Sequence, residues 1–231
     1  EVILDRTYSK IKKFQKDNFK PDLSEEEKIK GMELLEIQRQ AMLMYTSCGW
    51  FFSEISGIET VQIMKYAARA MQLASKFSKE NFEEKFLDIL AQAKSNIQEF
   101  GTGKDIYERF VKPSVVTSKQ IACLWAISSL YQDFDDEEDV YCYTVKRNDY
   151  QKVQKNNANF VIGNIEIRSK VTLQKANLVF ALMQYSGGDF HCAIKEYSTN
   201  EEYQELKTSL IKTFMLTPLT EIIRALDEKF G

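Results

Sequence analysis

The residues of this chain best suited to binding chemistry are three consecutive aromatics, Trp50, Phe51 and Phe52, which follow Gly49. We call residues 49–52 the aromatic elbow. Flat rings where a helix ends can either fill a core or line a cleft. In a cleft, the C–H face of a pyranose packs on an indole while the sugar hydroxyls bind nearby charged groups. The elbow is therefore a candidate sugar-stacking surface, and the alternative is that these rings are core aromatics at a helix junction, which is the commoner role of such residues.

Four polar residues after the elbow are expected to converge near it. Glu59, Tyr66 and Arg69 fall on one face of a predicted helix, together with Gln62, and Glu54 precedes that helix. A solvated helix face explains these residues equally well. The predicted substrate-binding residues are Trp50, Phe51, Glu54, Glu59, Tyr66 and Arg69.

No catalytic set is predicted. A glycosidase needs two carboxylates about 5–9.5 Å apart with separated pKa values. Glu54 and Glu59 flank the elbow, but Glu59 is explained by helix capping, so no defensible pair is left. His191 lies in an alternating strand pattern without a Ser or Cys partner in a nucleophile motif, which favours a structural role. We therefore expect no turnover by this chain alone, and no cofactor.

Metal binding is not predicted either. The four cysteines are scattered without a CxxC pair, and the chain has a single His, which argues against a zinc site. We expect free thiols in a reducing cytosol and hence a cytoplasmic protein. The acidic run at residues 133–139 lacks the Gly and the alternating ligands of a calcium loop, so we interpret it as a solvated linker. The cysteines are Cys48, Cys123, Cys142 and Cys192.

The composition excludes two classes of partner. The net charge of −3, from 31 basic and 34 acidic residues, provides no broad positive field for nucleic acid or an anionic membrane. No apolar run approaches the roughly 20 residues of a spanning helix. The chain begins at Glu1 and stops at Gly231 directly behind a helical pattern, so we interpret it as a fragment of a longer polypeptide.

The elements that must position the elbow are helices. Ser24 and Glu27 form a capping box, and the helix that follows is expected to end at Gly49. Ser56 and Glu59 match a second capping box, which begins a helix with apolar positions 61, 64, 67, 68, 71 and 74. Further helices are predicted over residues 79–100, 104–111 and 118–131.

After the acidic run the apolar period becomes two, which predicts strands at residues 141–145, 161–167, 175–185 and 190–194. Adjacent glycines predict a hairpin turn at residues 186–189. Two helices, over residues 200–214 and 218–230, complete the chain, with Pro218 as a first helical residue. The predicted fold class is α+β: an N-terminal helical bundle over residues 1–132, then an antiparallel β-sheet with two C-terminal helices over residues 133–231.

The order TSCGWFF, ISGIET and YAARAMQLA at residues 46–74 resembles the C-terminal helical region of glycoside hydrolase family 57-like proteins. More closely, the whole chain is similar to the uncharacterised C-terminal domain attached to a subset of them. The later segments GGDFHCAIKEYS and PLTEIIRALDEKFG belong to the same resemblance. The stretch from Tyr45 to Leu73 is the more specific part.

The resemblance implies a partner in the same polypeptide: an N-terminal catalytic barrel, with a Glu nucleophile and an Asp acid/base, that acts on α-glucans or related oligosaccharides. It also implies that the helical region packs on the barrel and contributes Trp50 to the substrate cleft, followed by a helix that carries Tyr66, Ala67 and Arg69. The chain departs from many relatives at Gly49, where an acidic residue often precedes the Trp. This departure argues against a polar contact to sugar from position 49 and against amylase-like activity of the parent protein.

Overall fold

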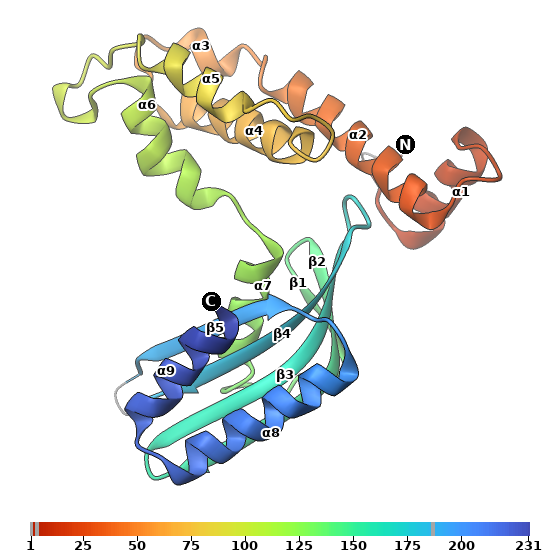
Figure 1. The fold of residues 1–231 in the computed structure, drawn as a ribbon. Coiled ribbons are helices and arrows are strands. Elements are labelled where there is room, and N and C mark those ends of the chain that lie inside the picture. Colours follow the sequence, from red (N-terminus) through yellow and green to blue (C-terminus); the bar gives the residue numbers. More distant parts are fainter. Residues whose placement is uncertain (1, 3–4, 186–187) are drawn as a thin grey trace. The chain divides into compact units, whose positions relative to one another are not determined.

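The computed structural model describes residues 2, 5–185 and 188–231, and the chain divides into two compact units, Glu1–Val115 and Val116–Gly231 (Figure 1). Helices come first along the chain, and a five-stranded antiparallel sheet and two C-terminal helices follow. This confirms the predicted fold class. No helix within the described ranges is long and apolar enough to cross a membrane.

The first unit is built of helices. Ser24 and Glu27 form the predicted capping box, in which the Ser24 hydroxyl accepts from the Glu27 N–H and the Glu27 carboxylate accepts from the Ser24 N–H. An apolar cluster that includes Met64, Ile106 and Tyr107 forms its core. The elements are α1 (Tyr8–Asn18), α2 (Glu25–Leu43), α3 (Cys48–Phe51), α4 (Ile58–Ala74), α5 (Phe82–Leu90), η1 (Gln98–Phe100), α6 (Gly103–Ile106), η2 (Tyr107–Val111) and η3 (Lys112–Ser114).

The second unit is a sheet with helices on both faces. Its elements are α7 (Ser118–Ser128), β1 (Glu137–Val140), β2 (Tyr143–Lys155), β3 (Ala158–Ser169), β4 (Lys175–Gln184), β5 (Phe190–Glu196), α8 (Asn200–Leu216) and α9 (Leu219–Phe230). The strands pair in chain order. Because side chains alternate along a strand, β3 turns Phe160 and Ile162 toward α8 and α9, and Val161 and Ile165 toward α7.

The acidic run is not a linker throughout, and that interpretation was wrong for its second half. Glu137–Val140 form the edge strand β1, which pairs with β2. Its charges have cationic neighbours, since Asp139 lies 2.6 Å from the Lys170 Nζ. Charged side chains on an edge strand also discourage pairing with other chains. The helix α7, which the sequence groups with the preceding helices, packs on the sheet instead.

Several predicted boundaries differ from the structure. α2 ends at Leu43, and Gly49, the expected stop, lies inside the short helix α3. The second capping box is absent, because Gly57 is the N-cap of α4 and no side chain caps it. The helix expected over residues 79–100 is the shorter α5, and Pro218 is the N-cap of α9 rather than its first residue.

The predicted strands are confirmed within β2 to β5, although β2 begins only at Tyr143. Tyr141 has a φ of 53° in the turn that precedes β2. Of the predicted turn at residues 186–189, residues 186 and 187 lie outside the described part of the chain. Gly188 has a φ of 93°, in the region that favours glycine.

Candidate functional site

The rings of the aromatic elbow point into solvent rather than into the core. The exposed fractions are 62% for Trp50, 77% for Phe51 and 55% for Phe52. The rings of Phe51 and Phe52 contact edge to face, with centroids 5.1 Å apart and an interplanar angle of 82°. Three consecutive aromatic side chains therefore form an exposed apolar surface at the C-terminal end of the short helix α3.

Contacts with α4 fix the position of the elbow within the first unit. The Thr60 hydroxyl donates to the carbonyl oxygen of Gly49 at 2.7 Å. Gly49 is buried, and a Cβ at this position would lie 2.1 Å from the Ile63 Cδ1. Only glycine lets α3 approach α4 this closely, so Gly49 sets the packing of the helix that carries Trp50.

Glu54 anchors the other side of the elbow. Its carboxylate accepts from the Ser95 hydroxyl at 2.6 Å, from the Asn96 N–H at 2.8 Å and from the Ser56 N–H at 2.8 Å. The Ser95 hydroxyl and then the Ser56 N–H are the largest causes that lower the pKa of Glu54 to about 2. Glu54 thus joins the segment after the elbow to residues 95 and 96.

The other predicted residues, Glu59, Tyr66 and Arg69, follow one another along α4. At about 1.5 Å per residue, Tyr66 and Arg69 lie roughly 10 Å and 15 Å along the helix axis from Glu59. Arg69 donates to the side chain of Gln72 in the next turn. Among the described residues, no hydrogen bond or ring contact joins any of the three to Trp50. The structure places Trp50 and Phe51 together, with Glu54 as an anchor.

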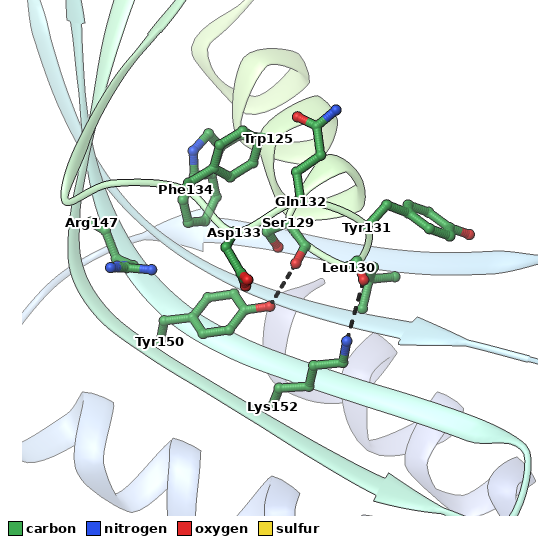
Figure 2. Close-up of a pocket in the computed structure, with 10 residues that line it drawn as sticks. All are labelled: Trp125, Ser129, Leu130, Tyr131, Gln132, Asp133, Phe134, Arg147, Tyr150 and Lys152. Atoms are coloured by element: carbon green, nitrogen blue, oxygen red, sulfur yellow. Dashed lines mark hydrogen bonds between the residues drawn. The ribbon is translucent and has the colours of Figure 1, made fainter.

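A pocket that the sequence did not indicate lies in the second unit, where the chain leaves the C-terminal end of α7 (Figure 2). We call it the α7 pocket. Its volume is about 300 Å³. Helix α7, the segment that follows it and strand β2 provide its walls. It is lined by Trp125, Ser129, Leu130, Tyr131, Gln132, Asp133, Phe134, Arg147, Tyr150 and Lys152.

A β-bulge in β2 determines which β2 side chains line the α7 pocket. Arg147 pairs with Ile165 and Asp149 with Asn164, so Asn148 is an extra residue on β2. After the bulge, Tyr150 pairs with Gly163 and Lys152 with Val161. Ile165, Gly163 and Val161 alternate along β3, so their partners Arg147, Tyr150 and Lys152 share the face of the sheet that α7 covers.

The bulge also turns Asp149 toward the opposite face. There its carboxylate accepts from the Tyr203 hydroxyl and lies 2.6 Å from the Lys207 Nζ, both on α8. Although its burial acts in the opposite direction, the hydrogen bonds from Lys207 and Tyr203 lower the pKa of Asp149. A single extra residue thus separates a structural ion pair on one face from the pocket side chains on the other.

Two hydrogen bonds tie β2 to the end of α7, as Figure 2 shows. The Tyr150 hydroxyl donates to the Ser129 carbonyl at 3.1 Å, and the Lys152 Nζ donates to the Leu130 carbonyl at 3.3 Å. Trp125 is 2% exposed and stacks on Phe134, with ring centroids 5.5 Å apart. The stacked rings of Trp125 and Phe134 and these two hydrogen bonds hold the pocket walls in place before any ligand binds.

The predicted thiols and histidine have identifiable neighbours in the second unit. Cys123 and Cys192 are free cysteines, and the neighbouring Cys192 thiol lowers the pKa of Cys123. The His191 Nε2 lies 3.3 Å from the Asp227 carboxylate. In the described part of the chain, no group of three or more His, Cys, Asp or Glu side chains is arranged to hold a metal ion.

Comparison with known proteins gives one match. The model of a family described as a domain of unknown function (DUF3536) matches residues 1–231. No curated protein and no solved structure matches the chain.

Proposed function

We propose that this chain, which belongs to the family described as a domain of unknown function (DUF3536), is a non-catalytic accessory domain of a glycoside hydrolase family 57-like protein. In this proposal the domain packs on a catalytic barrel of the same polypeptide. The aromatic elbow then contributes Trp50 to a cleft for α-glucan or a related oligosaccharide. The observation that carries the proposal is the exposure of Trp50, Phe51 and Phe52 at the end of α3, a helix that a hydrogen bond from Thr60 attaches to α4.

The physical case rests on preorganisation. Because the indole is already exposed, a sugar ring can stack on it without first pulling it out of a core. Because the backbone is already held in place, binding costs little further conformational entropy. Thr60 and Glu54 hold the two sides of the elbow through hydrogen bonds. Within the described residues, Glu59, Tyr66 and Arg69 make no hydrogen bond or ring contact with Trp50, so we assign sugar contact to Trp50 and Phe51 and a positioning role to Glu54.

The second candidate function is docking on a protein surface without any sugar contact. Other apolar side chains near the elbow in the chain are also exposed, among them Met42 at 76% and Ile58 at 79%. Exposed apolar residues of this kind also occur at protein interfaces. In that case the same rings would be covered by the neighbouring domain.

Trp50→Ala separates these functions. The chain has two tryptophans, and since Trp125 is buried, quenching of fluorescence by acrylamide reports mainly on Trp50. We expect maltoheptaose to shield Trp50 from acrylamide and Trp50→Ala to cost about 1–3 kcal/mol of binding free energy, the scale of an aromatic anchor. The thermal stability should change little, whereas truncation of a buried Trp costs about 3–5 kcal/mol.

Tyr8→Ala is the matched control, because Tyr8 is another aromatic of the first unit and is 65% exposed. It should leave the affinity for maltoheptaose unchanged. An affinity that Trp50→Ala does not alter would contradict sugar stacking at the elbow. Shielding of Trp50 by the barrel alone, with no response to any glucan, would support the docking function instead.

A further inference from the structure

We propose that the α7 pocket binds a small anionic polyol of the sugar phosphate class. This site lies in the second unit and is built from residues that the proposed function does not use. Evidence against one proposal would therefore leave the other unaffected.

The size and polarity of the α7 pocket limit its ligand. Its volume of about 300 Å³ lies at the lower end of the range of small-molecule sites, about 300–1,000 Å³. Such a space accepts a single sugar ring with one charged group, but not a dinucleotide. The amide of Gln132 and the charged groups of Asp133, Arg147 and Lys152 line it, which favours a hydrophilic ligand over a lipid.

Two cations provide charged N–H donors to the site. The Arg147 guanidinium has five N–H donors and gives one to the Asp136 carboxylate at 2.8 Å. Because Asp136 is 85% exposed, that ion pair is weak and leaves donors available. The Lys152 ammonium has three donors and gives one to the Leu130 carbonyl. Asp133 in the lining and Asp136 beside Arg147 balance the charges of the two cations, so the site would hold an anion through directed N–H donors rather than through an excess of positive charge.

The guanidinium also has the right shape for this role. Its planar fork matches two oxygens of a phosphate group, and charge-assisted hydrogen bonds of this kind are stronger than neutral ones. Arg147 and Lys152 lie on either side of Tyr150 along β2, and Figure 2 shows all three reaching from the strand toward residues 129–134. The partners of the two cations, Ile165 and Val161, are four residues apart on β3, which at about 3.3 Å per residue separates the two backbones by about 13 Å. A phosphate group on Arg147 would therefore lie on one side of the Tyr150 side chain, and Lys152 on the other side would donate to a sugar hydroxyl.

The remaining lining groups suit hydroxyls. The Asp133 side chain points toward Tyr150, so its carboxylate can accept from a ligand in the pocket, whereas the Gln132 side chain points away from Tyr150 and Lys152 (Figure 2). The Tyr131 hydroxyl accepts from Gln184 at 2.8 Å and points away from Tyr150 and Lys152 (Figure 2). The Phe134 and Tyr150 rings provide apolar surface for the C–H face of a sugar. A carboxylate in the lining would repel a bare phosphate but accept from sugar hydroxyls.

Titration calorimetry of the full 231-residue chain with three probes tests the proposal. Glucose 6-phosphate should bind more tightly than inorganic phosphate, and glucose most weakly. Arg147→Gln and Lys152→Gln should each weaken glucose 6-phosphate about tenfold or more, the effect of one charge-assisted hydrogen bond. Asp133→Asn should weaken glucose 6-phosphate without weakening inorganic phosphate.

Lys146→Gln is the matched control, because Lys146 is an exposed cation on β2 outside the pocket. It changes the net charge by the same amount and should leave every affinity unchanged. The proposal is overturned if none of the three probes binds at millimolar concentration, or if Lys146→Gln weakens binding as much as the pocket variants do. Equal affinity for inorganic phosphate and glucose 6-phosphate would exclude the polyol.

Two further readouts keep the test decisive. Lys152 is exposed, so Lys152→Gln remains informative if Arg147→Gln fails to fold. Trp50→Ala should leave the affinity for glucose 6-phosphate unchanged. Loss of glucan binding in that variant, with sugar phosphate binding intact, would show that the two sites are independent.

Discussion

Glu54 shows how one carboxylate can serve a binding surface without touching a ligand. All three of its hydrogen-bond donors come from the segment that follows the elbow and from residues 95 and 96. A carboxylate beside exposed aromatics suggests a sugar ligand, yet here its oxygens already have partners in the protein. The chemistry of the elbow thus belongs to its rings, and Glu54 sets where those rings lie.

This role predicts a pH dependence of stability that Glu54→Gln removes. The folded pKa of Glu54, about 2, lies below its unfolded value of 4.5, so its contribution to stability is present above pH 4.5 and is lost as the pH falls from 4.5 toward 2. Chemical denaturation of both proteins across this range should give a shallower decline for the variant. Glu59→Gln is the control and should follow the parent curve. Parallel curves for Glu54→Gln and the parent would contradict the anchoring role.

At the scale of elements, the contact between α3 and α4 decides the orientation of the elbow. The contact depends on Gly49, whose missing side chain leaves room for Ile63. Interiors are packed so closely that an added methyl group must displace its neighbours. The short helix α3 is therefore held by packing and by the Thr60 hydrogen bond rather than by its own helical propensity.

Gly49→Ala should accordingly destabilise the first unit by about 1–3 kcal/mol, the usual cost of overpacking. Ile63→Ala removes the atoms that clash, so the double variant should lose less stability than the sum of the single variants. Thermal melting of the four proteins measures this coupling. Gly57→Ala is the control, since its Cβ would meet its nearest neighbour at 3.3 Å. Additive effects of the two changes would show that Gly49 does not act through Ile63.

At the scale of the whole molecule, each apolar core draws on one unit only. The cluster around Tyr107 uses residues of the first unit, and the two clusters on the faces of the sheet use residues of the second. Burial of apolar side chains is the main favourable term in folding, so a unit with its own core has its own source of stability.

We therefore expect the fragment Val116–Gly231 to fold by itself. It should show a cooperative thermal transition and a dispersed amide spectrum by nuclear magnetic resonance, because α7, the sheet, α8 and α9 supply both of its cores. A fragment that begins at residue 133 lacks α7 and with it Trp125, so it is the matched comparison and should be less stable. A disordered Val116–Gly231 fragment, or equal stability of the two fragments, would contradict this account.

The sequence by itself determined the fold class and most of the elements. Helical and strand periods and the Ser24 capping box are local patterns, because each depends on residues only a few positions apart in the chain. Only the tertiary structure decided the sites. Whether Trp50 is exposed depends on what packs around it, and two of the hydrogen-bond partners of Glu54, Ser95 and Asn96, lie about forty residues away in the chain. The bulge at Asn148 disrupts the period of two and brings Arg147, Tyr150 and Lys152 to one face, so no alternating pattern could group them.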